Sequence, residues 1–182
     1  MRVYNKILLV ILLMISITVM TVYYPNTMKY LNVTYSELTS DAQKQVTCLA
    51  DNIYHEAGYE PEDGKIAVAL VTLNRVNDER FPKDICSVVK QKVNATCQFS
   101  WFCMNLTNNK NNPAYVESLT TALWVYANYE QLEDITKGAI YYHADYVNPQ
   151  WKLKKTTKIG RHIFYKDYND AKTESSAKGR TI

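Results

Sequence analysis

Apolar residues recur at helical spacing in the segment that begins near residue 46. One side of a helical wheel carries Val46, Leu49, Ala50, Ile53, Tyr54 and Ala57. Gly58 follows and predicts the end of this helix. The next residues, Glu60-Pro61-Glu62-Asp63, predict a helix start, with proline at the first helical position and acids in the first turn. Residues 66–73 are apolar around the whole wheel, so we expect this second helix to be central and buried.

The second half of the chain predicts one more long helix and two short extended segments. Asn112-Pro113 opens a helix that ends near Glu130. Its apolar face carries Val116, Leu119, Leu123 and Tyr126. Residues 139–143 and 162–165 read as short strands. The pattern therefore predicts a mainly α fold, formally α+β, with a small β element.

A long apolar run precedes these elements. Ile7–Tyr24 contains no charged residue and at about 1.5 Å per residue is just long enough to cross a bilayer core. Arg2 and Lys6 precede it, which favours a cytoplasmic amino terminus and an exported remainder. Because no small-residue cleavage site follows, we expect an uncleaved signal anchor rather than a removed signal peptide. Either interpretation places the domain outside the cytoplasmic membrane, in the periplasm or cell wall space.

Changes in composition along the chain predict its division into four segments, and the net charge argues against one class of partner. We expect an anchor with a cytoplasmic stub at 1–24, a polar linker at 25–40, one folded domain at 41–166 and a flexible tail at 167–182. The net charge of +3 is small and looks spread out, which argues against a nucleic-acid partner. The 15 tyrosines and three tryptophans offer ring faces of the kind that stack on sugars.

All four cysteines follow the apolar run, in a compartment where disulfides persist. Four cysteines permit three pairings. Cys97 and Cys103 are close enough to close a short loop, which would leave Cys48 with Cys86.

Glu56 is the side chain best suited to chemistry. It falls at the edge of the apolar stripe, near the end of the first helix. Partial burial and the negative end of the helix dipole both disfavour the anion, so both raise the expected pKa. Cleavage of a glycosidic bond needs such a protonated acid, because the leaving oxygen must receive a proton. On this feature alone, a solvated boundary glutamate is the favoured interpretation.

A series of motifs resembles the spore-cortex-lytic and cell wall hydrolases of the SleB/CwlJ type. In order along the chain, these motifs are 48–58 (CLADNIYHEAG), 64–76 (GKIAVALVTLNRV), Phe81-Pro82, 85–89, 97–101 with Cys103, 138–143 (GAIYYH), Pro149-Gln150-Trp151 and 159–165 (IGRHIFY). The resemblance implies a lysozyme-like, lytic-transglycosylase-like helical domain that binds peptidoglycan glycan strands in a groove. It carries the family's catalytic glutamate onto Glu56 and implies cleavage between N-acetylmuramic acid and N-acetylglucosamine. The family's E-A-R-G-E is replaced here by Glu56-Ala57-Gly58-Tyr59-Glu60, which lacks the arginine.

Substrate contacts are expected from groups that can bind sugar hydroxyls or stack on sugar rings. The candidates are Gln98, Ser100, Tyr141, Tyr142 and His143. We expect neither a metal nor an organic cofactor, and we expect membrane contact through the amino-terminal helix alone.

The number of working carboxylates decides the mechanism. Hydrolysis needs a second one, for which Glu60, Glu62, Asp63 and Asp145 are the candidates. Because Glu62 and Asp63 read as first-turn helix acids and Asp145 as a loop residue, lytic transglycosylation with Glu56 alone is favoured over hydrolysis. Two other classes remain open. A zinc amidase could use His55, His143 and His162, although Tyr59 breaks the two-histidine helical motif, and a wall-binding module would need no catalytic acid.

Overall fold

The computed structural model describes Lys6 and residues 31–168 of the chain. The chain divides into two compact units, residues 1–31 and 32–182, and the fold described here belongs to the second. The expected anchor at Ile7–Tyr24 lies outside the described residues. Among the residues that are described, no helix has the length and apolar character needed to span a membrane.

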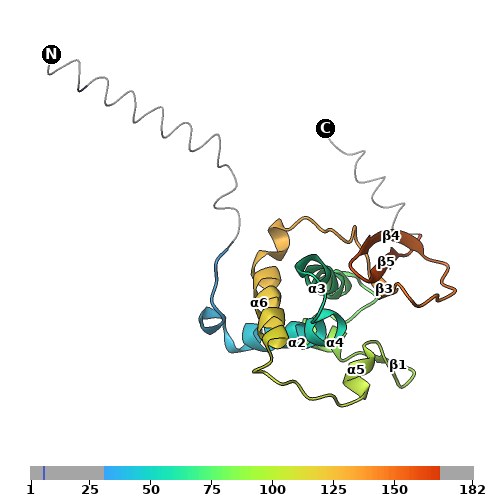
Figure 1. Ribbon diagram of the computed structural model, residues 1–182, viewed down its shortest axis with the longest axis horizontal. Coiled ribbons are helices and arrows are strands. Elements are labelled where there is room, and N and C mark those ends of the chain that lie inside the picture. The colour runs from blue at the N-terminus through green and yellow to red at the C-terminus, as the bar shows by residue number, and fades with distance from the viewer. Residues whose placement is uncertain (1–5, 7–30, 169–182) are drawn as a thin grey trace. The chain divides into compact units, whose positions relative to one another are not determined.

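Three long helices form the body of the domain (Figure 1). They are α2 (Ser40–Ala57), α3 (Glu62–Asn77) and α6 (Pro113–Asn128). Thr39 caps α2 by accepting the amide of Ala42, and Asn112 caps α6 by accepting the amide of Ala114. The sequence predicted Pro61 at the first helical position of α3. In the structure Pro61 is instead the N-cap, and the helix begins one residue later at Glu62. The three predicted helices are otherwise confirmed.

Helix α3 is the central helix, as its apolar wheel predicted. Ala67, Val68, Ala69 and Val71 are fully buried. One buried polar side chain, that of Asn52, ties α2 to two neighbours. Asn52 donates to Thr72 of α3 at 3.2 Å and accepts from the indole of Trp101 at 3.0 Å. These bonds satisfy polar groups that burial would otherwise leave costly.

A three-stranded antiparallel sheet packs beside the helices, in the order β3 (Tyr141–Ala144), β5 (His162–Lys166), β4 (Lys154–Ile159). Tyr142 pairs with Phe164 and Tyr141 with Tyr165. Because side chains alternate along a strand, Tyr142 and Phe164 share one face while Tyr141, His143 and Tyr165 share the other. Phe164 packs with Ala67 and Val71 of α3, so its face is the inner one. We call the opposite surface the outer sheet face.

Two strands of this sheet were predicted, and β4 was not. The sequence also gave no signal for the short elements η1 (Tyr35–Glu37), α4 (Ile85–Val89), β1 (Lys92–Val93), β2 (Thr96–Cys97), α5 (Ser100–Cys103) and η2 (Tyr129–Gln131). Both suggested disulfides, Cys48–Cys86 and Cys97–Cys103, are present.

The folded unit begins before residue 41, the expected start of the domain, and includes part of the expected linker at 25–40. The hydroxyl of Tyr35 donates to the carbonyl of Gln43 at 3.1 Å and pairs with the hydroxyl of Thr47 at 2.8 Å. The amide of Gln43 returns a bond to the Tyr35 carbonyl. At the other end, Asp167 forms an ion pair with Arg80. Residues from both the expected linker and the expected tail therefore pack onto the domain.

Candidate active site

Glu56 lies at the next-to-last position of α2, beside a cavity of about 440 Å³. The cavity is lined by residues 54–60 together with Leu106 and Thr107. Its volume falls in the range of small-molecule sites. A glutamate that ends a buried helix thus has its backbone held by the core and its carboxyl beside an open cavity, which is the arrangement a catalytic acid needs.

The surroundings of Glu56 favour its protonated form. Burial raises the pKa of its carboxyl above the ordinary value, while a hydrogen bond from Tyr142 and the charge of Arg75 act in the opposite direction. The Tyr142 hydroxyl donates to Oε2 of Glu56 at 3.1 Å. Burial also raises the pKa of Tyr142 well above its ordinary value, so this hydroxyl stays a donor. One carboxyl oxygen is therefore held in place by Tyr142.

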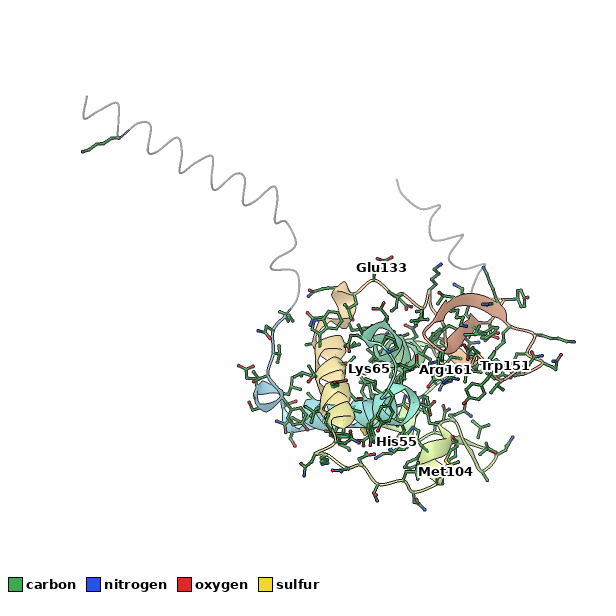
Figure 2. All side chains as sticks on the ribbon, viewed as in Figure 1. His55, Lys65, Met104, Glu133, Trp151 and Arg161 are labelled. Atoms are coloured by element: carbon green, nitrogen blue, oxygen red, sulfur yellow. A yellow bond between two sulfur atoms is a disulfide. The ribbon has the colours of Figure 1, made fainter. Side chains whose placement is uncertain are left out.

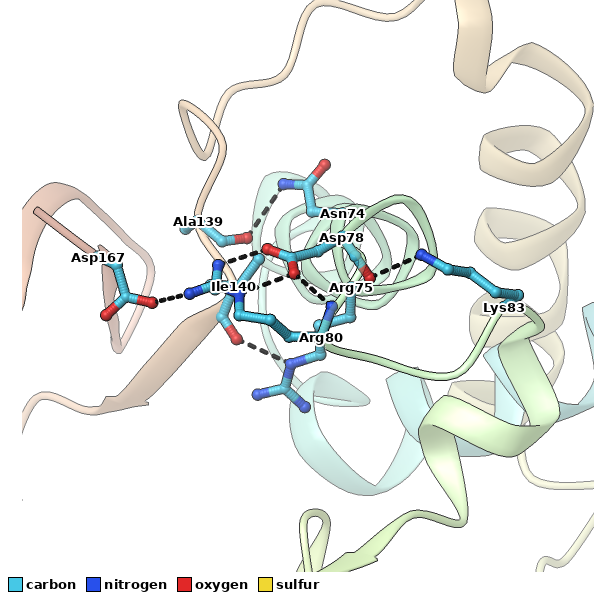
Figure 3. Close-up of polar contacts among 8 residues, drawn as sticks. All are labelled: Asn74, Arg75, Asp78, Arg80, Lys83, Ala139, Ile140 and Asp167. Atoms are coloured by element: carbon cyan, nitrogen blue, oxygen red, sulfur yellow. Dashed lines mark hydrogen bonds and ion pairs between the residues drawn. The ribbon is translucent and has the colours of Figure 1, made fainter. Parts of the chain in front are cut away.

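Asn74 and Arg75 hold the strand that carries Tyr142 (Figure 3). The Asn74 amide donates to the carbonyl of Ala139 at 3.0 Å, and Nε of Arg75 donates to the carbonyl of Ile140 at 2.8 Å. These two bonds tie the end of α3 to the segment before β3. Because residues 139–140 lead directly into β3, these bonds fix the position of Tyr142 against Glu56.

Arg75 has a second feature, which the sequence did not predict. Its side chain is buried, with the guanidinium over the rings of Phe81 and Phe99 at 5.4 and 5.0 Å. Its Nη1 has no hydrogen-bond partner among the described residues. A buried cation without a paired acid is costly, and such groups gather at functional sites. Arg75 therefore supplies positive potential to the region where the carboxylate of Glu56 would form.

The four candidates for a second carboxylate have different surroundings. Glu60 alone of the four lines the cavity with Glu56, and its Oε2 accepts the backbone amide of Arg161 at 3.0 Å. A side chain at Gly160, where φ is +53°, would come within 2.2 Å of that oxygen. Glu62 accepts a bond from Thr121, Asp145 pairs with Lys158, and Asp63 lies exposed in the first turn of α3. Glu60 is thus engaged in holding the β4–β5 turn.

The segment between α5 and α6 forms one wall of the cavity through Leu106 and Thr107, which the sequence did not indicate. Asn108 ties this segment to α2. Its side chain contacts Nε2 of His55 at 2.5 Å and donates to Asp51 at 2.6 Å. The His55 ring stacks on Trp101 with centroids 4.5 Å apart. His55 therefore lines the cavity with Glu56 and also supports its wall through Asn108 and Trp101.

The five predicted substrate contacts separate into three places. Tyr142 contacts Glu56 on the inner sheet face. Tyr141 and His143 lie on the outer sheet face, where Nε2 of His143 pairs with the Tyr165 hydroxyl at 3.0 Å. Gln98 and Ser100 are exposed around the start of α5 and do not line the cavity. The structure thus brings one of the five against the candidate acid.

The three histidines of the proposed zinc site are held by different partners. His55 stacks on Trp101, His143 pairs with Tyr165, and His162 packs edge-on against Tyr142 with centroids 5.2 Å apart. Within the described part of the chain, no group of three His, Cys, Asp or Glu residues is arranged to hold a metal ion. The zinc amidase interpretation is not favoured by this arrangement.

The Tyr142 hydrogen bond predicts a change in pH dependence. In Tyr142→Phe, Glu56 loses the donor that lowers its pKa, so that pKa rises further. An acid that acts protonated loses activity as the pH rises through its pKa, so the alkaline limb of the pH–activity curve should move to higher pH. Turbidity loss of peptidoglycan suspensions across a pH series measures this. Tyr141→Phe, one residue away on the outer sheet face, is the matched control and should leave the limb in place.

Comparison with known proteins places the chain in a family. The cell wall hydrolase family model matches residues 59–165, more than half of the chain. The chain belongs to the cell wall hydrolase family. The match begins just after Glu56, so it does not itself include the candidate acid.

Curated relatives of this cell wall hydrolase are spore cortex-lytic enzymes. That of Oceanobacillus iheyensis is 28% identical over 132 residues, which cover 69% of this chain and 42% of the relative. That of Bacillus subtilis is 26% identical over 130 residues, covering 68% and 38%. The chain thus spans less than half the length of these relatives.

Two solved structures share the fold. The catalytic domain of the germination-specific lytic transglycosylase SleB from Bacillus anthracis is 28% identical, with a TM-score of 0.54, and the match covers 68% of this chain and 95% of that domain. The catalytic domain of the Bacillus cereus SleB protein is 26% identical, with a TM-score of 0.50, covering 78% and 98%. The mainly helical, lysozyme-like fold class expected from the sequence is confirmed.

Proposed function

We propose that this chain cleaves peptidoglycan at the bond between N-acetylmuramic acid and N-acetylglucosamine by lytic transglycosylation, with Glu56 as the acid and then the base. One observation carries the proposal: Glu56 is a partly buried carboxyl of raised pKa that faces a cavity and is held by Tyr142. Two comparisons support the proposal: the chain belongs to the cell wall hydrolase family, and it is similar to the catalytic domain of a lytic transglycosylase.

The reaction balances with Glu56 alone. Protonated Glu56 donates its proton to the bridging oxygen as the bond from C1 of the muramic acid breaks, and the glucosamine leaves with a free hydroxyl. The C6 hydroxyl of the same muramic acid then attacks C1 and gives its proton to the Glu56 carboxylate. A 1,6-anhydro sugar forms, Glu56 is protonated again, and no water is consumed. The charge of Arg75 stabilises the carboxylate between the two steps.

Hydrolysis is the second candidate, because Glu60 lines the same cavity. It would require Glu60 to activate water or act as the nucleophile. The engagement of Glu60 with the amide of Arg161 favours a structural role instead.

Mass spectrometry of the fragments released from purified sacculi tests the proposal. Anhydromuramic ends are expected. Reducing muramic ends would replace transglycosylation by hydrolysis, and release of free stem peptides from intact glycan would overturn glycosidic cleavage altogether.

We further propose that residues 41–166 act as the catalytic domain on the outer side of the cytoplasmic membrane, anchored by Ile7–Tyr24. The support is the uncharged run with Arg2 and Lys6 before it. Protease added to intact spheroplasts should digest the domain, and protection of the domain would sink this topology.

A further inference from the structure

The positive charge of the chain is concentrated in one segment. Residues 145–161 contain five basic residues and one acid, a net charge of +4, whereas the whole chain carries +3. The bases are Lys152, Lys154, Lys155, Lys158 and Arg161. The even spread expected from the total was therefore wrong. This segment comprises the connection from β3 to β4, β4 itself and the turn into β5.

Exposed apolar side chains lie in the same segment. Tyr146, Val147 and Trp151 are 76%, 46% and 44% exposed. The guanidinium of Arg161 lies over the Tyr146 ring at 5.4 Å. In Figure 2 the labels of Trp151 and Arg161 both lie near the sheet and away from α6. Solvent-exposed rings beside cations are typical of a binding surface rather than of a solvated loop.

The outer sheet face continues this surface. Trp151 contacts three rings on that face: Tyr141 at 6.2 Å, His143 at 5.4 Å and Tyr165 at 5.8 Å. Lys155 on β4 pairs in register with Tyr165, so its side chain lies on the same face. The Trp151 ring is thus held by three neighbours while nearly half of it stays open to solvent. A ring fixed in this way loses little conformational freedom when a ligand stacks on it.

The sheet residue that contacts Glu56 lies on the inner face, opposite this surface. Tyr142, which bonds Glu56, projects to the inner face, whereas Trp151, Tyr165 and Lys155 belong to the outer one. The mechanism proposed above uses none of these three. They form a second surface that has no assigned role.

We propose that the outer sheet face, with Trp151 at its centre and Lys152 and Lys155 beside it, binds a stretch of peptidoglycan away from the bond being cleaved. The inference rests on the proposed function for its choice of polymer. Sugar rings present apolar faces that stack on tryptophan and tyrosine, and the free carboxylates of the peptidoglycan stem peptides are complementary to the lysines. Such a contact holds the enzyme on an insoluble substrate between cleavage events, because a linked second site raises the effective concentration of the first.

The test compares binding with catalysis in the full-length chain, kept soluble in a nonionic detergent. Co-sedimentation with sacculi stripped of other wall polymers measures binding, and cleavage of short soluble glycans measures the active site. Trp151→Ala should weaken sedimentation about tenfold. Lys152→Ala/Lys155→Ala should weaken it about threefold at low salt, with the difference lost at high salt. Both variants should cleave short glycans at the parent rate.

Lys44→Ala/Lys90→Ala removes two exposed cations outside the segment and is the matched control for charge. Trp151→Phe keeps a ring and should restore most of the binding, which excludes loss of folding as the cause. The proposal is overturned if Trp151→Ala sediments with sacculi as well as the parent does. It is also overturned if the parent binds anionic lipid vesicles but does not bind stripped sacculi. If the proposed function fails, the parent releases no anhydro fragments, yet the sedimentation comparison still stands on its own.

Discussion

Replacing Glu56 with glutamine is expected to reduce cleavage of peptidoglycan about a thousandfold, the usual contribution of a general acid. The amide has nearly the same shape and can still accept the hydrogen bond from Tyr142, but it has no proton to give to the leaving oxygen. Because a partly buried carboxyl becomes a neutral amide, stability should stay the same or rise slightly. Fragment release from sacculi measures activity, and thermal unfolding measures stability.

Glu60→Gln is the matched comparison, since it changes a carboxyl of the same cavity. Under transglycosylation it should cost at most a few-fold in rate, through the weakened bond to the Arg161 amide. A loss as large as that of Glu56→Gln would instead assign Glu60 to hydrolysis. Digestion by Glu56→Gln at the parent rate would remove the whole mechanism.

The helical part of the fold could be predicted because each long helix has its own signal. The stripe on α2, the apolar wheel of α3 and the Asn112-Pro113 start of α6 are local patterns, and the core follows from them. Strand β4 lacks such a signal, because its sequence KKTTKI has one apolar residue and depends on pairing with β5. Short elements such as α5 are fixed by a disulfide and by neighbours that are distant in sequence.

The site could be predicted only in part, because it too depends on contacts between segments that are distant in sequence. The partial burial of Glu56 could be predicted because its place at the edge of a helical stripe is a local property, and the resemblance to the SleB/CwlJ-type hydrolases then indicated it as the acid. That Tyr142 faces Glu56 while Tyr141 and His143 face away follows from strand register, which the sequence did not give. Nη1 of Arg75, which is buried and has no hydrogen-bond partner among the described residues, lies near the rings of Phe81, which follows α3, and Phe99, which precedes α5. Contacts between distant segments therefore decide which of several suitable side chains act together.

The second large effect is expected from the Cys48–Cys86 disulfide. It joins α2 to α4 across 38 residues that include all of α3, and both cysteines belong to the buried core. Constraining a loop of this length in the unfolded chain stabilises the fold by about 4 kcal/mol. Cys48→Ala/Cys86→Ala should lose about that amount, a large share of the 5–15 kcal/mol typical of a domain. Urea unfolding under non-reducing conditions measures the loss.

The Cys97–Cys103 bond gives the matched contrast. It spans six residues, so the same chain-entropy argument gives only about 2 kcal/mol. It also closes the segment that carries Trp101, which stacks on His55 beside the cavity wall. Cys97→Ala/Cys103→Ala should therefore lose less stability but more activity than Cys48→Ala/Cys86→Ala at temperatures where both are folded. Equal losses of stability in the two variants would mean that local packing, rather than the length of the closed loop, sets the contribution of each bond.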